Sequence, residues 1–269
     1  MSTIALEIII PVHSADATLA PTIASLVAQT DRRFGVLLSD ALSPDESASL
    51  NESERKLAAA GITARRVKAP TGLSAIEHWN WAHAQSTANW LKPLAPGEQL
   101  KPNYVAALLA RIIEKPAAQF IRCDAELQTD WGTEILRAPC DRASLTPAEF
   151  VNYFPARVDW ISRSVNIACS RTAWLAMGGR SPQFPAFAAL NSNVILALHY
   201  GVENLALPLV SADYTDKVPL NAPVRGRVNL WLELWLLLRQ ARNYCLSAKI
   251  AWPNKCLAAQ SLFAVWRRL

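Results

Sequence analysis

The sequence predicts an α/β fold built around a parallel sheet, and three neighbouring segments carry this prediction. Residues 7–13 read EIIIPVH, a β-branched run typical of a parallel strand that is covered on both faces, and Pro11 is expected to end it. Apolar residues then recur at helical spacing, at Leu19, Ile23, Leu26 and Val27. Residues 34–40, FGVLLSD, form a second strand that ends in an aspartate. Together they make a βαβ unit, whose strand ends are expected to build a ligand site.

Length and composition are compatible with one large domain and a tail. The chain has 269 residues, of which 51% are hydrophobic and 18% charged, enough for a sizeable core in a single α/β domain. Residues 219–226, PLNAPVRG, read as a linker. We therefore expect a domain over residues 1–218 and a C-terminal helical extension over residues 219–269.

The extension is basic, apolar and rich in tryptophan. Residues 225–269 hold eight basic residues and one acid, whereas the preceding part holds 19 basic and 21 acidic residues. The apolar run around Trp231 and Trp235 is broken by Glu233 and Arg239, which leaves it short of the ~20 residues of a membrane span. An amphipathic helix is expected, which lies on a membrane surface or packs on the domain or on a second copy of the chain. Nucleic acid is not an expected partner, because the basic residues alternate with leucine.

The cysteines and the N-terminus indicate a cytoplasmic protein. The five cysteines show neither CxxC nor metal-ligand spacing: Cys123, Cys140, Cys169, Cys245 and Cys256. They are therefore interpreted as reduced structural thiols. The first strand follows the N-terminus directly, without the pattern of a secretory signal. We expect a cytoplasmic location, or a peripheral one on the inner face of the membrane.

Several segments resemble family 2 glycosyltransferases of the GT-A fold. Residues 11–14 (PVHS), 28–30 (AQT) and 40–45 (DALSPD) correspond to the family's strand end Pro-Val-Tyr-Asn, its Ala-Gln-Thr-like turn and its Asp-Asp-Gly-Ser-x-Asp turn. Four later segments continue the resemblance, which covers residues 4–207: 72–82, 90–104, 164–171 and 177–180. The resemblance implies a mixed sheet flanked by helices. It also implies an inverting, hexosyltransferase-type transfer from a nucleotide-sugar donor to a saccharide or lipid-linked acceptor in surface glycan synthesis.

The resemblance also implies residues that bind the donor. Pro11, Val12 and His13 would form the floor under the nucleotide base. Asp40, at the end of the second strand, would read the base or the ribose, or cap its own turn. Asn80 would lie on the next helix, where it contacts the nucleotide or has a capping or solvated role.

The charge of the donor's diphosphate requires a positive partner. Enzymes of this fold usually hold Mg²⁺ or Mn²⁺ in an Asp-x-Asp turn, since hard cations take oxygen ligands. Here residues 95–98 read APGE, so Glu98 is the metal-ligand candidate, with Asp40 or Asp45 beside it. The alternative is metal-independent, with Lys92 or an arginine against the diphosphate, although Lys92 also fits an edge position.

The expected position of the catalytic base holds amides instead of acids. Asn191 and Asn193 lie in residues 187–194, FAALNSNV, and a neutral amide cannot accept a proton at pH 7. If the correspondence of the turn shifts by a residue or two, other acids would serve in place of the missing ones: Asp124, Glu126 and Asp130. His78, His83 and His199 are not spaced as a metal site and are interpreted as surface or core residues.

Three functional hypotheses are therefore open. The first is a working glycosyltransferase. The second is a degenerate relative that binds a nucleotide sugar or a glycan without transferring it. The third is a membrane-attached scaffold subunit. All three share the predicted fold, because fold alone does not decide activity.

Overall fold

The computed structural model describes residues 5–14, 16–130, 132–154, 158–161, 163–182 and 188–213. The predicted extension over residues 219–269 lies outside these residues, as does the predicted boundary at residue 218. Within the described part, no helix combines the length and the apolar character that crossing a membrane requires.

The described strands form one mixed sheet. They are β1 (Leu6–Val12), β2 (Gly35–Asp40), β3 (Thr63–Lys68), β4 (Trp90–Pro93), β5 (Gln99–Leu100), β6 (Phe120–Thr129), β7 (Gly132–Leu136), β8 (Ser144–Leu145), β9 (Ile167–Ser170) and β10 (Val202–Asp213). The sheet order is β3-β2-β1-β4-β9-β6-β10-β5, with β7 on β6 and β8 on β10. Strands β1 to β4 are mutually parallel, and β9 runs antiparallel to its neighbours β4 and β6.

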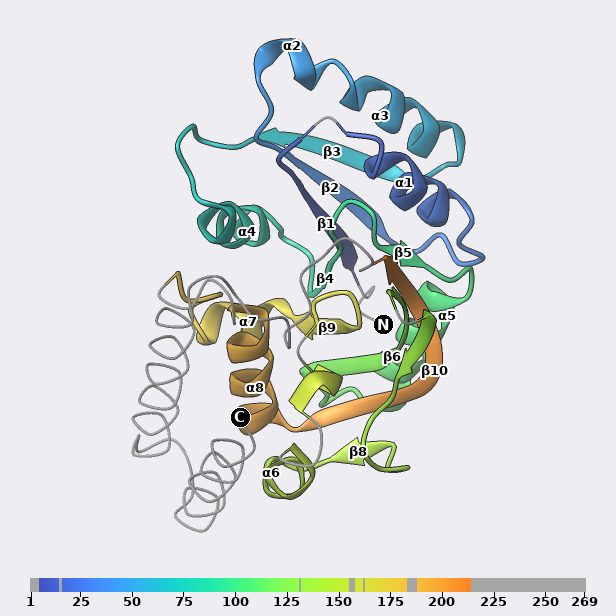
Figure 1. Ribbon diagram of the computed structural model, residues 1–269, viewed down its shortest axis with the longest axis vertical. Helices are drawn as coiled ribbons and strands as arrows, with labels where there is room; N and C mark the ends of the chain where they lie inside the picture. Colours follow the sequence, from blue (N-terminus) through green and yellow to red (C-terminus); the bar gives the residue numbers. More distant parts are fainter. Residues whose placement is uncertain are drawn as a thin grey trace.

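Helices flank this sheet. They are α1 (Leu19–Val27), α2 (Pro44–Ser47), α3 (Leu50–Ala59), α4 (Ala75–Ala84), α5 (Tyr104–Glu114), α6 (Pro147–Tyr153), α7 (Arg171–Ala176) and α8 (Ala188–Tyr200), with a 3-10 turn η2 (Val158–Ile161). Figure 1 shows α1 and α3 on one side of the β1–β3 part and α4 on the other. The predicted α/β class and its first strand–helix–strand unit, β1-α1-β2, are confirmed.

Strand β1 runs past the proline that was expected to end it. Pro11 pairs in register with Ser39, and Val12 with Asp40. The carbonyl of Ile9 accepts from Leu94 on the β4 side, whereas that of Val12 accepts from the chain beyond β2, so alternate residues face alternate neighbours. Pro11 therefore faces the β4 side, where the ladder has already ended at Ile9. Its missing N–H costs β1 no hydrogen bond.

Two glycines at helix ends allow a matched test of packing. Gly61 follows α3 with φ +72° and Gly201 follows α8 with φ +74°. A Cβ at residue 201 would lie 2.3 Å from the carbonyl oxygen of Leu145, whereas a Cβ at residue 61 meets nothing within 4 Å. We expect Gly201→Ala to lower the free energy of unfolding by about 1–3 kcal/mol more than Gly61→Ala, as overpacking against rigid groups does. Urea unfolding of both variants measures the difference, and equal losses would contradict the clash.

Candidate functional site

The ends of three parallel strands place charged and polar side chains side by side. Asp40 is in register with Val12 of β1 on one side and with Lys68 of β3 on the other. His13 follows β1, and the turn at residues 94–98 follows β4. The carboxyl edge of such strands is the usual ligand position in an open α/β sheet. The residues expected to contact the donor, among them His13 and Asp40, therefore lie at one edge of the sheet.

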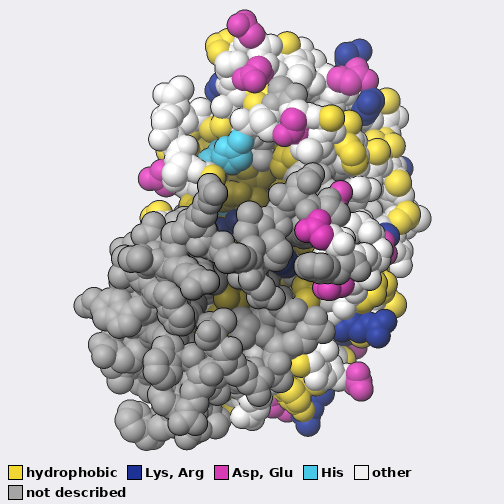
Figure 2. Space-filling model, in the orientation of Figure 1, with side chains coloured by type: hydrophobic (Ala, Val, Ile, Leu, Met, Phe, Trp, Pro, Cys, Tyr) yellow, Lys and Arg dark blue, Asp and Glu magenta, His cyan; other side chains and the backbone are white. Residues whose placement is uncertain are grey.

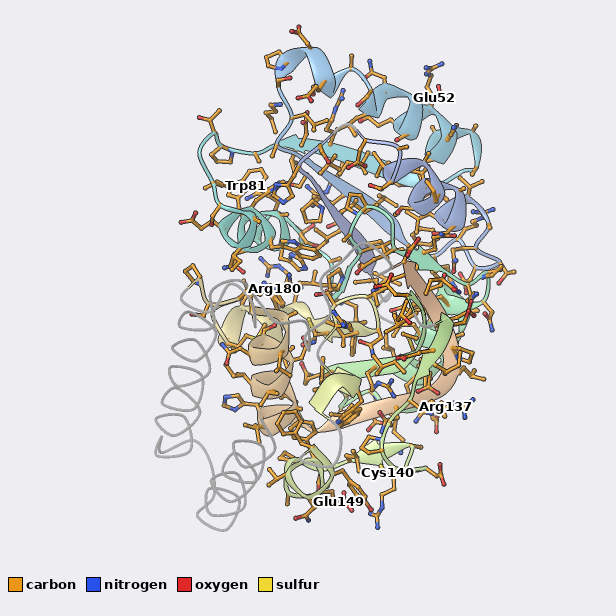
Figure 3. All side chains as sticks on the ribbon, in the orientation of Figure 1. Glu52, Trp81, Arg137, Cys140, Glu149 and Arg180 are labelled. Carbon is orange, nitrogen blue, oxygen red and sulfur yellow. The ribbon has the colours of Figure 1, made fainter. Side chains whose placement is uncertain are left out.

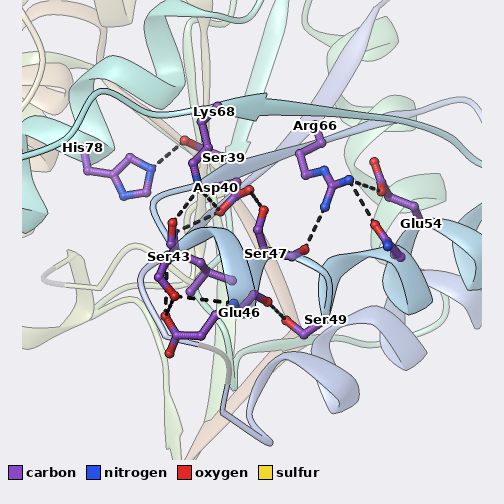
Figure 4. A network of polar contacts seen from close by, with 12 residues as sticks. Ser39, Asp40, Ser43, Glu46, Ser47, Ser49, Glu54, Arg66, Lys68 and His78 are labelled. Carbon is purple, nitrogen blue, oxygen red and sulfur yellow. Dashed lines mark hydrogen bonds and ion pairs between the residues drawn. The ribbon is translucent and has the colours of Figure 1, made fainter.

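Asp40 is a buried, ionised anchor of the turn between β2 and α2. Its carboxylate accepts hydrogen bonds from the Leu42 N–H at 3.0 Å, from the Lys68 ammonium at 3.2 Å and from the Ser47 hydroxyl (Figure 4). Burial opposes ionisation, but these donors outweigh it and hold the pKa of Asp40 below its usual value. The expected capping role is thus present, and a contact with base or ribose stays a prediction.

A histidine pair lies beside Asp40. The Ser74–Glu77 capping box starts α4 at Ala75 and so sets the position of His78, which is wholly buried. The His78 Nε2 lies 2.6 Å from the Ser39 hydroxyl. Its Nδ1 lies 3.2 Å from the nearer ring nitrogen of His13, and the two rings meet edge to face.

This pair is uncharged at neutral pH. Burial, helped by the neighbouring His13, lowers the pKa of His78 to about 4, and burial also lowers the pKa of His13. His13 is the exposed member, so its neutral ring is available to a ligand. Figure 2 shows histidine atoms at the surface next to a hydrophobic hollow. The interpretation of His78 as a surface or core residue is confirmed, since it is 0% exposed, whereas its contact with His13, 65 positions away in the chain, was not predicted.

The turn after β4 does not form an acidic cluster. Glu98 is 5% exposed, and its Oε2 accepts from the Ala95 N–H at 2.7 Å, which closes the turn. Asp45 lies exposed in α2, and Asp40 is held by its own partners. Among the described residues, no group of three or more His, Cys, Asp or Glu side chains could hold a metal ion. The acids of this edge therefore do not fit the oxygen cage that Mg²⁺ or Mn²⁺ requires.

Lys92 is an internal charge rather than an edge residue. β4 lies between β1 and β9, so the edge alternative for Lys92 was wrong. Its side chain is 0% exposed, and its ammonium donates to the carbonyls of Pro93 at 2.6 Å and Val165 at 2.8 Å. Burial lowers the pKa of Lys92 to about 8, against the charge of nearby Glu98, which raises it. The ammonium is thus engaged inside the protein, where it ties β4 to the chain before β9.

A glycine turn brings an arginine to the same region. Asn80 of α4 accepts from the Arg180 N–H at 2.8 Å and donates to the Arg180 carbonyl at 2.7 Å. Gly179, with φ +76°, lies so close to Asn80 that a Cβ would come within 2.6 Å of its Oδ1. The Arg180 guanidinium stacks on Trp79, 4.0 Å from the ring centroid. Figure 3 shows Arg180 between α4 and α7.

Arg180 was missed by sequence reasoning, although the Gly178–Gly179 turn and Asn80 were both singled out. The available signal was the basic residue directly after the two glycines. We call the two hydrogen bonds between the Asn80 amide and the Arg180 backbone the Asn80 clamp. Asn80 and Arg180 lie 100 residues apart in the chain, so no local sequence pattern joins them. Asn80 engages the backbone of Arg180 with both ends of its amide, a role that differs from capping or solvation.

The amides at the expected base position are engaged in the protein, as are two of the three alternative acids. Asn193 donates to the carbonyls of Ile161 at 2.7 Å and Arg163 at 3.1 Å, and Asn191 is also buried on α8. The acids outside α8 differ in exposure: Asp124 pairs with buried Arg122 at 2.8 Å, Glu126 pairs with Lys101 at 3.1 Å, and Asp130 lies exposed in the turn after β6. The geometry assigns none of them to proton abstraction.

The sheet order and the flanking helices define the fold class: the chain has the GT-A fold. S. aureus TarS 1–349 in complex with UDP-GlcNAc matches with a TM-score of 0.75 and 12% identity, over 97% of this chain and 72% of that chain. The same protein in complex with UDP matches with a TM-score of 0.72 and 11% identity, over 98% and 71%.

A mannosyltransferase is similar as well. PcManGT from Pyrobaculum calidifontis, in complex with GDP-Man and Mn²⁺, matches with a TM-score of 0.61 and 13% identity, over 98% of this chain and 74% of that chain. No protein-family model and no curated protein matches the sequence. At these identities the structural likeness shows the fold.

Proposed function

We propose that this chain is a glycosyltransferase that binds a nucleotide-sugar donor at the carboxyl edge of β1, β2 and β4. The observation that carries the proposal is the arrangement of exposed His13 beside the ionised Asp40–Lys68 pair at that edge. It occurs in a fold shared with structures that hold UDP, UDP-GlcNAc and GDP-Man. The acceptor is a saccharide or a lipid-linked saccharide of surface glycan synthesis, and transfer inverts the sugar carbon.

The residues have distinct roles in donor binding. The neutral ring of His13 stacks on the base or hydrogen-bonds its edge, above Pro11 and Val12. Asp40 is 1% exposed and has three of its acceptor positions filled by the protein, so a ribose hydroxyl that binds Asp40 has to displace one of these donors. UDP is the first nucleotide to test, because the neighbours that hold UDP or UDP-GlcNAc have higher TM-scores than the neighbour that holds GDP-Man.

Calorimetric titration with UDP, GDP, dTDP and CMP tests donor binding. We expect one nucleotide to bind with a Kd of about 1 μM to 1 mM, the range of typical substrate constants. His13→Ala is expected to weaken that binding about tenfold, which corresponds to one lost contact of about 1.4 kcal/mol. His199→Ala, a change of the same type on α8, is the matched control and should bind like the wild type. Failure of all four nucleotides to bind at millimolar concentration would overturn the proposal.

One observation is compatible with a second function, in which the chain binds a nucleotide sugar without transferring it. The expected base region of α8 carries the buried amides Asn191 and Asn193, and neither amide accepts a proton at neutral pH. A chain that binds a nucleotide sugar without transferring it would have this arrangement. Product analysis by mass spectrometry separates the two functions: glycosylated acceptor from the matching nucleotide sugar supports transfer. Tight donor binding with no product from a panel of saccharide and lipid-linked acceptors supports the binding function.

A further inference from the structure

Among the described residues, the metal-ligand candidate Glu98 lies near two of the protein's own positive charges. The charge of Glu98 acts on both Lys92 and Arg180, and it raises the pKa of each against the opposing effect of burial. Their hydrogen bonds hold the two cations at adjacent chain positions, since Lys92 donates to the Val165 carbonyl and Arg180 donates to the Ser164 hydroxyl. In the part of the chain that the structure describes, two positive charges therefore lie near one carboxylate. Such a cluster repels Mg²⁺ or Mn²⁺ and attracts an anion.

We propose that the guanidinium of Arg180 takes the place of the divalent cation and contacts the diphosphate of the donor, so that donor binding needs no metal. This inference rests on the proposed function, because it assigns a residue to the diphosphate part of that same site. The sequence left two alternatives open for the diphosphate charge: a metal held by Glu98, or a lysine or arginine without a metal. The inference selects the second alternative and identifies the arginine as Arg180.

Arg180 suits this role better than Lys92 does. The Lys92 ammonium is wholly buried and donates to two carbonyl oxygens. Arg180 is 7% exposed and donates from Nη2 to the Ser164 hydroxyl, and its buried Nε has no hydrogen-bond partner among the residues that the structure describes. A guanidinium has five N–H donors in a planar fork that matches phosphate oxygens. Diphosphate oxygens would thus meet donor capacity that the protein itself leaves unused.

The surroundings of Arg180 hold it in one orientation. Its ring partner Trp79 and its backbone partner Asn80 are adjacent on α4, and Gly179 allows the chain to approach that helix. Burial lowers the pKa of Arg180 to about 10, which still leaves the guanidinium charged at neutral pH. Because the guanidinium is already fixed in place, it can bind the diphosphate without first rearranging its surroundings.

Titration of the full-length chain with UDP and with uridine, each in EDTA and in Mn²⁺, tests the inference. We expect the wild type to bind UDP with the same affinity in both buffers. Arg180→Gln is expected to weaken UDP binding at least tenfold and to leave uridine binding unchanged, because uridine has no diphosphate. Arg180→Lys should lie between these two. Arg171→Gln on α7, which removes a donor to the Ser86 carbonyl, is the matched control and should bind UDP like the wild type.

The outcomes are distinguishable from failure of the proposed function. Absence of binding by both UDP and uridine to the wild type counts against a uridine donor and overturns the inference with it. Binding of UDP that requires Mn²⁺, or equal UDP affinity of Arg180→Gln and wild type, overturns the inference alone. If Arg180→Gln weakens UDP binding and uridine binding equally, Arg180 has a structural role, and the inference is overturned as well. Urea unfolding of Arg180→Gln establishes that the variant is folded before titration.

Discussion

Acidification from pH 7 to pH 5 is expected to lower the free energy of unfolding by about 2–4 kcal/mol, through two buried histidines. Burial lowers the pKa of His78 to about 4 and that of His83 to about 3. Both are neutral in the folded protein, whereas in the unfolded chain they take up protons below about pH 6.5. The unfolded state therefore binds more protons, and stability falls as the pH drops from 6.5 towards these lower values.

The packing around the two rings explains why they stay neutral. His83 lies between the rings of Trp79 and Trp174, and its Nδ1 lies 2.7 Å from the Trp79 carbonyl. The neighbouring charge of Arg180 also lowers the pKa of His83. His78 is enclosed between His13 and Ser39. A proton on either ring would place a charge where no carboxylate pairs with it directly.

Urea unfolding at several pH values between 5 and 7 measures this dependence. The range lies above the ordinary pKa of Asp and Glu, so carboxylates contribute little to the slope. His78→Gln and His83→Gln should each remove a large part of the slope, and the double variant should keep only a small remainder, to which His13 contributes because burial lowers its pKa as well. A double variant that keeps the wild-type slope would show that other groups cause it.

Replacing Asn80 by alanine is expected to lower the free energy of unfolding by about 2–4 kcal/mol, because two part-buried backbone groups lose their partners. These groups are the N–H and the carbonyl of Arg180, at 2.8 Å and 2.7 Å from the Asn80 amide. Loss of the clamp frees the turn that carries the guanidinium. UDP binding should therefore weaken as well.

Urea unfolding and UDP titration of Asn80→Ala measure the two effects. Asn51→Ala is the matched control: Asn51 is an exposed asparagine whose Oδ1 accepts from Arg66 at 3.0 Å, and its loss should cost less than about 1 kcal/mol. A stability loss in Asn80→Ala no larger than that in Asn51→Ala would contradict the clamp.

The fold could be predicted because its signals are local. The run Ile8–Ile10 is wholly buried in β1, as a β-branched run covered on both faces should be. The strand that ends at Asp40 follows a helix of the expected spacing. Each of these signals lies within a dozen residues, where propensity and periodicity act. One local prediction was wrong: β1 does not end at Pro11. Whether a proline ends a strand depends on whether the position of its missing N–H faces a paired neighbour, and Pro11 faces β4 beyond the end of their pairing.

The positions of some candidate residues could be predicted for the same reason. Asp40 ends a strand, and the resemblance pointed to His13 directly after another; the structure brings both to one edge, and their contact with a donor stays a prediction. Lys92 was placed at an edge or a phosphate, because its strand is short and nothing local reveals that β9 pairs on its far side. Arg180 was missed, since its partners Trp79 and Asn80 lie on another element. The contact of His78 with His13 was not predicted for the same reason.

By itself, the sequence determined the α/β class, the strand ends that form one edge and the absence of the usual acids near Glu98. Only the tertiary structure decided which charges surround that position. Asn80 and Arg180 are 100 residues apart, and His13 and His78 are 65 apart. Hydrogen bonds, stacking and desolvation act through space over a few ångströms, so they depend on how the chain packs and are not encoded in neighbouring residues.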